Sequence, residues 1–301
     1  MLREERWTTK VFGHQITIKL GFGLEFLQKC IRPTIKFKTN FPYLSGDVFS
    51  DMCDYKIDNQ VFNLERLQES ERIFVKGDLV PYIASNFGYL FNNKTVVVSN
   101  SDQNFSSEDF KQFNAKALFV QNLVNHGLKN HFTLPIGIEN LRQNGSGKSK
   151  YFKMQPLRKS EDVVLVPPMG ETNLARRNTK KLIANNKLFL IYEKRLPRKQ
   201  YFKLLSQHRF VLVLEGNGFD THRLWEVLYQ GSFPVMLRSN WAQSLQYLSL
   251  PILMLDDVED IDTTLLKDFL SKNKDYEPEK MKQLWAPWWQ QLIMSAGEIQ
   301  V

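Results

Sequence analysis

The chain has few cysteines and no long apolar run. Only Cys30 and Cys53 occur in 301 residues, without a CxxC pair or a Cys/His spacing typical of zinc. We therefore predict neither a disulfide framework nor a structural metal, and a reducing compartment fits best. The longest apolar runs, such as 187–192 and 248–255, are far shorter than the ~20 residues that a membrane helix needs. The charged N-terminus MLREERWTTK leads into no apolar segment, so we expect a cytoplasmic protein without a secretory signal.

The charge balance is positive. Forty Lys plus Arg against thirty-two Asp plus Glu give a net charge of +8, and 43% hydrophobic residues are enough for a full core. A positive balance favours phosphate-bearing or other anionic partners. The basic residues are spread from Lys10 to Lys282 and interleaved with acids, whereas a nucleic-acid surface needs a continuous stripe. We expect no nucleic-acid partner.

Short apolar strands alternate with helix-sized segments along the chain, which is typical of parallel α/β proteins. In the first half we predict strands at 94–100, 116–122 and 131–140, a serine-capped helix at 106–113, and a linker or mobile loop at 141–153. Residues 1 to about 90 are expected to form an irregular front end and the first strands. In the second half we predict strands at 162–170, 188–193, 210–215, 234–238 and 251–257, and helices at 173–185, 198–207 and 221–230. Trp285, Trp288 and Trp289 of the helical tail are expected to pack in the core.

A polar corner follows the strand that begins at Phe210. Gly216, Asn217 and Gly218 come first, and the glycines allow positive φ and the close approach of a ligand to the backbone. Asp220 or Thr221 then caps a helix that ends at Gly231. In a parallel sheet such a corner lies at the carboxyl edge, where ligands bind and helix N-termini offer free N–H groups.

The helix after this corner carries Arg223 and Glu226 on one flank, beside an apolar stripe of Leu224, Val227 and Leu228. A cation and a carboxylate near a helix N-terminus suit a nucleoside diphosphate: arginine for phosphate oxygens and glutamate for ribose hydroxyls. The alternative is a surface pair worth ~0.2–0.5 kcal/mol to the helix. The preceding glycines and the Asp-Thr-His turn favour the ligand. We expect His222 to donate to phosphate or sugar, the alternative being that it fills the corner between loop and helix.

The run EGNGFDTHRLWEVLYQGSFPVM, followed by LPILML, resembles the C-terminal signature of exostosin-like glycosyltransferases. The resemblance is specific over 210–260 and weaker through VVVSNSDQNF, KALFVQN and LPIGIEN in the first half. It implies a GT-B architecture, with two Rossmann-like domains facing across a cleft: 1–155 on the acceptor side and 156–301 on the donor side. This architecture allows the terminal helix to pack back on the first domain. Glu215 stands where relatives often have a basic turn, which is a departure from the pattern.

The resemblance implies an enzyme, a hexosyl- or pentosyltransferase that moves sugar from a UDP- or GDP-sugar to a carbohydrate acceptor with inversion, in polysaccharide or glycan biosynthesis. A lipid-linked acceptor would add peripheral membrane association. No metal or other cofactor is expected, because the DxD formed by Asp260 and Asp262 lies in an acidic run more typical of a helix start or a solvated loop. Arg176 or Arg177 would then bind the pyrophosphate, the alternative being a solvated basic helix.

Inversion requires a general base for the acceptor hydroxyl. The catalytic candidates are Asp102, just beyond the predicted strand 94–100, and Glu139, at the end of the predicted strand 131–140, with Asp102 first and His126 as a further option. The alternatives are an Asx-turn for Asp102 and a capping or loop role for Glu139. A protein of the same fold that binds nucleotide or glycan without turnover is the other function the sequence allows.

Overall fold

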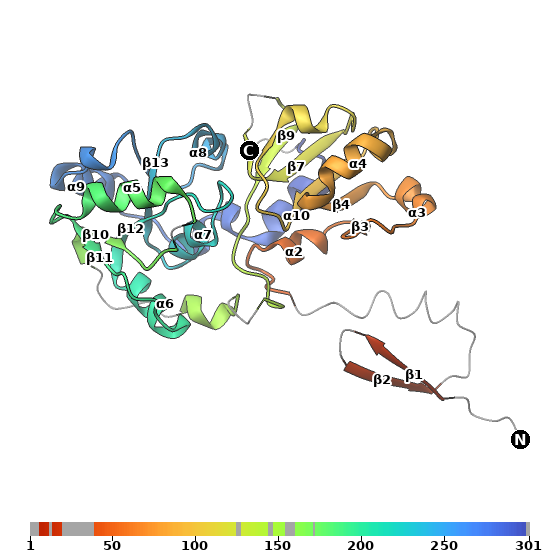
Figure 1. Cartoon of the computed structure of the whole chain (residues 1–301), viewed down its shortest axis with the longest axis horizontal. Coiled ribbons are helices and arrows are strands. Elements are labelled where there is room, and N and C mark those ends of the chain that lie inside the picture. Colours follow the sequence, from red (N-terminus) through yellow and green to blue (C-terminus); the bar gives the residue numbers. More distant parts are fainter. Residues whose placement is uncertain are drawn as a thin grey trace, which may run out of the picture. The chain divides into compact units, whose positions relative to one another are not determined.

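A computed structural model describes residues 6–11, 14–19, 39–124, 128–143, 147–153, 160–170 and 172–298. The chain divides into two compact units, Met1–Thr39 and Asn40–Val301. The first unit contains the antiparallel strands β1 (Arg6–Val11) and β2 (His14–Lys19). The second unit contains two five-stranded parallel sheets, so the fold class is α/β, as predicted (Figure 1).

The first sheet follows the order of the chain. Its strands are β3 (Tyr55–Ile57), β4 (Arg72–Lys76), β5 (Thr95–Ser99), β7 (Ala117–Gln121) and β9 (His131–Leu134). A short pair, β6 (Phe105–Ser106) and β8 (Leu123–Val124), lies beyond β5 and β7. All five residues of β5 are buried, because a parallel strand in an α/β protein is covered on both faces.

The second sheet has the order β11-β10-β12-β13-β14. Its strands are β10 (Ser160–Val166), β11 (Phe189–Ile191), β12 (His208–Leu212), β13 (Phe233–Leu237) and β14 (Leu253–Leu255). The chain therefore runs from β10 outward to β11 and then returns to the other side of β10. In open α/β sheets ligands bind at such a reversal, outside the carboxyl ends of the strands. The loops after β10 and β12 are consequently the place to look for a site.

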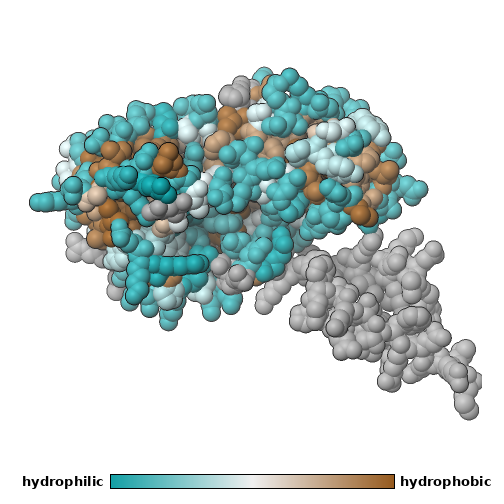
Figure 2. Space-filling view, viewed as in Figure 1, coloured by the Kyte–Doolittle hydropathy of each residue, from teal (hydrophilic) through white to brown (hydrophobic). Residues whose placement is uncertain are grey.

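The helices cover these sheets. They are α2 (Gly46–Ser50), α3 (Leu64–Glu69), α4 (Val80–Phe87), α5 (Leu174–Ile183), α6 (Arg198–Ser206), α7 (His222–Tyr229), α8 (Asn240–Ser244), α9 (Thr263–Lys272) and α10 (Ala286–Met294). In the described part of the chain, no helix combines the length and apolar character needed to cross a membrane. Hydrophilic residues cover much of the face in Figure 2, and hydrophobic ones form separate patches.

The largest hydrophobic cluster includes residues of both sheets and of the helices between them. In β12, Val211 belongs to this cluster while Phe210 and Leu212 pack on the opposite face, as strand alternation requires. Trp288 and Trp289 are buried and Trp285 is half-buried, which confirms that the tail tryptophans are core. Because Trp289 meets Phe49 edge-on at 5.8 Å between ring centroids, α10 of the second half lies against α2 of the first.

Several local predictions need correction. The strand expected over 131–140 ends at Leu134, since Pro135 cannot donate to a ladder and Gly137 has φ +67°. The helix expected at 106–113 is a single 3₁₀ turn, Ser107–Phe110, although Ser106 does cap it. The expected linker holds a 3₁₀ turn, Ser149–Lys153, in which Phe152 is buried against the second half of the chain.

The acidic run 256–262 starts helices, as expected. Asp257 and Asp260 form a capping box around a 3₁₀ turn, and Asp262 is the N-cap of α9. No group of three potential metal-ligating side chains occurs among the residues that the structure describes.

Candidate functional site

A hollow of about 530 Å³ opens at the reversal point of the second sheet. It lies where the loop after β10, the start of α6 and the start of α7 meet. We call it the arginine-lined hollow. Its described lining residues are Pro168, Arg176, Arg195, Leu196, Pro197, Arg198, Tyr201, Thr221, His222, Arg223 and Glu226. Four arginines against one carboxylate make this surface positive, which suits an anionic ligand.

Arg223 and Glu226 both line this hollow and are joined through Tyr201. The Tyr201 hydroxyl donates to Glu226 Oε2 at 2.9 Å and accepts from Arg223 Nε at 3.3 Å. Arg223 Nη2 also donates to the Pro168 carbonyl at 2.7 Å, and Arg198 Nη1 lies 3.4 Å from Glu226 Oε1. Burial, and next the nearby Glu226 carboxylate, raise the pKa of Tyr201, so its hydroxyl keeps its proton. A buried carboxylate held by one phenol and one half-exposed arginine has acceptor capacity left for a ligand.

Arg176 is buried and holds the corner after β12. Its guanidinium donates to the carbonyls of Leu214 at 3.0 Å, Glu215 at 2.7 Å and Gly170 at 3.1 Å. Burial, and secondarily the charge of Arg223, lower the pKa of Arg176 from its usual value. Arg177, the other residue expected to bind the pyrophosphate, is exposed on α5 and is not among the described residues that line the hollow. Arg176 therefore shapes the hollow largely through the backbone.

The glycines of the corner have a different function from the expected one. Neither Gly216 nor Gly218 is among the described residues with positive φ, so the conformational freedom that glycine allows is not used at either position. A Cβ on Gly218 would approach Asn122 Nδ2 to 2.5 Å, and one on Gly216 would approach Arg176 Nη2 to 3.1 Å. The small residues allow other parts of the chain, rather than a ligand, to come close.

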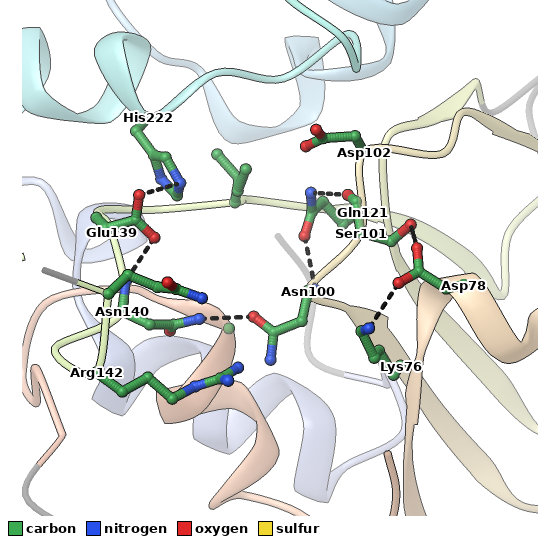
Figure 3. A pocket seen from close by; sticks show the side chains of 13 residues that line it. Lys76, Asp78, Asn100, Ser101, Asp102, Gln121, Glu139, Asn140, Arg142 and His222 are labelled. Carbon is green, nitrogen blue, oxygen red and sulfur yellow. Dashed lines mark hydrogen bonds and ion pairs between the residues drawn. The ribbon is translucent and has the colours of Figure 1, made fainter. Parts of the chain in front are cut away.

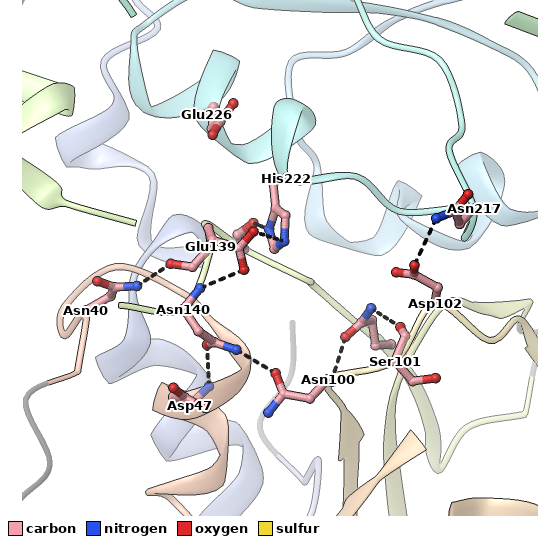
Figure 4. Close-up of polar contacts among 12 residues, drawn as sticks. Asn40, Asp47, Asn100, Ser101, Asp102, Glu139, Asn140, Asn217, His222 and Glu226 are labelled. Carbon is pink, nitrogen blue, oxygen red and sulfur yellow. Dashed lines mark hydrogen bonds and ion pairs between the residues drawn. The ribbon is translucent and has the colours of Figure 1, made fainter. Parts of the chain in front are cut away.

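The corner after Gly216 is bonded to the first half of the chain. Asn217 Nδ2 donates to Asp102 Oδ2 at 3.2 Å, and the Phe219 N–H donates to Asn104 Oδ1 at 3.0 Å (Figure 4). The Asp220 N–H donates to Asn122 Oδ1 at 2.7 Å. This explains why an apolar strand leads into a polar turn: its polar groups join the two halves.

Asp220 is buried rather than open to a ligand. Its carboxylate accepts from the Ile136 N–H at 2.7 Å and from the Trp225 indole at 3.0 Å. Burial raises the pKa of Asp220 to about 7, although these hydrogen bonds act in the opposite direction. Thr221 occupies the N-cap of α7 but makes no capping bond, and its buried Oγ1 has no partner among the described residues. Of the two expected capping residues, Asp220 and Thr221, Thr221 therefore makes no side-chain hydrogen bond to the start of α7.

A second hollow, of about 500 Å³, lies at the carboxyl ends of β4, β5 and β7 (Figure 3). We call it the amide-lined hollow. Its described lining residues are Gly46, Lys76, Asp78, Asn100, Ser101, Asp102, Gln121, Ile136, Glu139, Asn140, Arg142, Gln143 and His222. The two cations here are paired, Lys76 with Asp78 at 2.7 Å and Arg142 with Asp47 at 3.0 Å. Carboxamides and hydroxyls, which both donate and accept, suit a hydroxyl-rich ligand.

The amides of this hollow are held in a network. Asn140 Nδ2 donates to Asn100 Oδ1 at 2.8 Å, while Asn140 Oδ1 accepts from the Asp47 N–H at 2.8 Å (Figure 4). Gln121 accepts from the Asn100 N–H at 3.1 Å and donates to the Ser101 carbonyl at 2.7 Å. Asn100 has φ +61° at the end of β5, a conformation that asparagine tolerates well. The network fixes the side chains before any ligand binds.

Both catalytic candidates line the amide-lined hollow, Asp102 at its exposed edge and Glu139 deeper. His222 lines both hollows, so it marks their junction. Its Nε2 lies 3.6 Å from Glu139 Oε2, and its Nδ1 lies 2.8 Å from the Gly137 carbonyl oxygen. His126 lies outside the described residues.

Sequence reasoning missed residues that complete both hollows. Arg195 comes from the loop between β11 and α6, and Arg198 and Tyr201 come from the first turn of α6; the run KRLPRK, a cluster of cations after a strand, covers the loop and the start of this helix. That cluster at a strand's carboxyl end was a usable signal. Lys76, Asn140 and Arg142 had no comparable pattern.

Fold and site together define an α/β protein with two Rossmann-like parallel sheets and polar hollows at their carboxyl edges. No protein-family model matches the chain, and no curated protein matches it. Among solved structures, α,α-trehalose-6-phosphate synthase from Burkholderia multivorans is similar over 78% of this chain and 71% of its own length, at 9% identity and a TM-score of 0.31. A likeness this slight carries no functional argument, and the exostosin-like resemblance stays a prediction.

Proposed function

We propose that the chain is a glycosyltransferase of the GT-B type, which transfers a sugar from a nucleoside diphosphate sugar to a carbohydrate acceptor. The donor binds in the arginine-lined hollow and the acceptor in the amide-lined hollow. The reaction inverts the anomeric centre without a metal ion. UDP and GDP are the expected nucleotides.

The observation that carries this proposal is the contrast between two hollows that share His222. The arginine-lined hollow has four arginines and the buried Glu226, whereas the amide-lined hollow has paired cations and a set of amides. An anionic donor and a neutral polyhydroxylated acceptor need this division of charge, and their reacting ends must meet at the junction. The position of the arginine-lined hollow at the reversal of strand order supports a nucleotide ligand.

Within this proposal, Arg223 and Arg198 bind diphosphate oxygens, and Glu226 accepts from the ribose hydroxyls. Thr221, His222 and Arg223, at the start of α7, line the same hollow, so the positive end of this helix would stabilise negative charge on the leaving group. Arg176 acts by holding residues 214–216. Asp102 and Glu139 are the carboxylates available on the acceptor side.

Thermal-shift screening with UDP, GDP, ADP and CMP tests donor binding. A nucleotide at a hundred times its dissociation constant should add ~2.7 kcal/mol to the unfolding free energy. Glu226→Ala should abolish the shift, and Glu226→Gln, which retains the side-chain shape, should weaken it. Glu259→Gln, at an exposed site of the second half, is the matched control and should keep the full shift. An unchanged shift in both Glu226 variants would exclude Glu226 from the nucleotide site.

Turnover separates this proposal from a non-catalytic binding protein. A binding protein would show the nucleotide shift but release no nucleotide from UDP-glucose, UDP-N-acetylglucosamine, GDP-mannose or other donors tested with carbohydrate acceptors. A transferase should release nucleotide only where the matching sugar is transferred or, slowly, hydrolysed.

A further inference from the structure

The imidazole of His222 stands at the junction of the two hollows with its tautomer fixed. A carbonyl oxygen can only accept a hydrogen bond, so the 2.8 Å contact with Gly137 requires a proton on Nδ1. In the neutral ring Nε2 is then the nitrogen without a proton. Any proton that His222 gains or loses is therefore exchanged at Nε2.

The backbone that fixes this tautomer is itself fixed. Gly137 has φ +67°, and a Cβ there would collide with the Leu44 carbonyl, so the loop after β9 passes close to Leu44. The Ile138 N–H donates to that same carbonyl at 2.8 Å. On the α7 side, the neighbouring Asp220 is held by Ile136 and Trp225. His222 thus has little freedom to turn its ring.

Glu139 faces the nitrogen that exchanges the proton. Its Oε2 is 3.6 Å from His222 Nε2, its Oε1 accepts from the Asn140 N–H at 3.2 Å, and its carbonyl accepts from Asn40 at 2.7 Å (Figure 4). The charged or titratable groups near the ring include Glu139 after β9, Asp220 before α7, and Arg223, which follows His222 on α7. A carboxylate at this place stabilises the imidazolium that forms when Nε2 takes up a proton.

From this arrangement we propose that His222 is the general base of the transfer reaction and that Glu139 is its positioning residue. The inference rests on the proposed function. As the acceptor oxygen bonds to the anomeric carbon, its proton passes to His222 Nε2. The bond from the anomeric carbon to the diphosphate oxygen breaks, and its electron pair leaves with the diphosphate. The imidazolium, paired with Glu139, afterwards returns its proton to solvent.

With His222 as the base, Asp102 has a structural role in place of the catalytic one expected from the sequence. Asp102 is exposed and accepts a hydrogen bond from Asn217, so it belongs to the contact between the halves at the outer edge of the amide-lined hollow. His222, in contrast, lines the hollow of the donor as well as that of the acceptor. A base must reach the hydroxyl at the point where donor and acceptor meet, which is the requirement that His222 fulfils.

The test compares His222→Asn, whose amide can still donate to Gly137 but cannot take up a proton, with wild type and with the control His131→Asn. The donors are UDP-glucose, UDP-galactose, UDP-N-acetylglucosamine, GDP-mannose and GDP-fucose, and the readouts are released nucleotide and the thermal shift with UDP or GDP. We expect His222→Asn to keep the shift and lose ~10²–10⁴-fold in turnover, and the control to match wild type. Two outcomes would overturn the assignment and leave the proposed function standing. In the first, wild type is active and His222→Asn has near-normal turnover. In the second, turnover is lost in Asp102→Asn alone. Wild type without nucleotide binding or turnover would overturn both.

Glu139→Gln tests the positioning role. Without the carboxylate the imidazolium that forms during transfer is less stabilised, so kcat should fall while the donor KM and the thermal shift with nucleotide stay unchanged, and Glu139→Asp should restore part of the rate. A merely structural role would raise the donor KM and weaken the thermal shift as well. Nitrogen-15 NMR of the labelled protein supplies a readout independent of activity. The imidazole signals of His222 are those that disappear in His222→Asn. In the neutral ring they should show the proton on Nδ1. A neutral ring protonated on Nε2 would overturn the assignment.

Discussion

At the scale of single residues, the polar side chains of the corner after β12 have two different surroundings. Arg223, Glu226 and His222 line the arginine-lined hollow because helical spacing alone puts them on the flank of α7 away from its apolar stripe. Asp220 was equally polar in the sequence, yet its carboxylate is buried. The partners that bury it, Ile136 and Trp225, come from another loop and from the next turn of α7, and no local pattern indicates such contacts.

Asp220 makes the stability of the protein depend on pH. Its pKa rises from 3.8 to about 7 on folding, so between these values the folded state binds more protons than the unfolded state. Stability must therefore fall as pH rises through this window, by up to about 1.4 kcal/mol per pH unit. Urea unfolding of wild type and Asp220→Asn at pH 4 to 8 measures this.

Asp220→Asn should be less stable overall, because its Nδ2 would replace one of the two carboxylate oxygens that accept from the Trp225 indole, and two donors would then meet. It should lack the wild-type slope between pH 4 and 7. The same slope in both proteins would mean that another group titrates.

At the scale of elements, most strands and helices of the second half lie where the apolar pattern predicted them, since buried parallel strands give short, nearly continuous apolar runs. The observed β10, β12 and β13 are examples. The prediction failed at 106–113, where one 3₁₀ turn replaces a helix. Phe105, Phe110 and Phe113 of this segment are buried together, and packing of their rings outweighs the helical pattern.

Arg176 stabilises the turn after β12, which no side chain of that turn could hold alone. Arg176→Lys keeps a charge but can satisfy only part of the three backbone carbonyls, so we expect a loss of ~2–4 kcal/mol in unfolding free energy. The thermal shift with UDP or GDP should also be smaller in Arg176→Lys than in wild type. Arg177→Lys, at the exposed neighbouring position, should change stability by less than ~1 kcal/mol. A greater loss of nucleotide binding in Arg177→Lys would make Arg177 the diphosphate ligand.

At the scale of the whole molecule, the hydrogen bonds between the halves of residues 40–301 lay beyond sequence reasoning. Asn104 and Asn122 precede Phe219 and Asp220 by about a hundred residues, and only the folded chain shows that they bond. The α/β rhythm predicted two sheets. It did not predict that one hydrophobic cluster would include residues of both.

This shared cluster predicts cooperative unfolding. Trp289 is fully buried and packs α10 on Phe49, so Trp289→Ala should cost ~3–5 kcal/mol. Urea transitions followed by far-UV circular dichroism and by fluorescence should still coincide. Met294→Ala, at a position 61% exposed on the same helix, should have little effect. Two separate transitions in wild type would contradict a common core.

The central claim is that a nucleoside diphosphate binds where α6 and α7 begin, beside the junction marked by His222. A crystal structure of the chain with UDP or GDP tests this most directly. We predict diphosphate oxygens within hydrogen-bonding distance of Arg198 or Arg223, and ribose hydroxyls on Glu226. A nucleotide bound elsewhere, with Glu226 still held only by Tyr201 and Arg198, would contradict it.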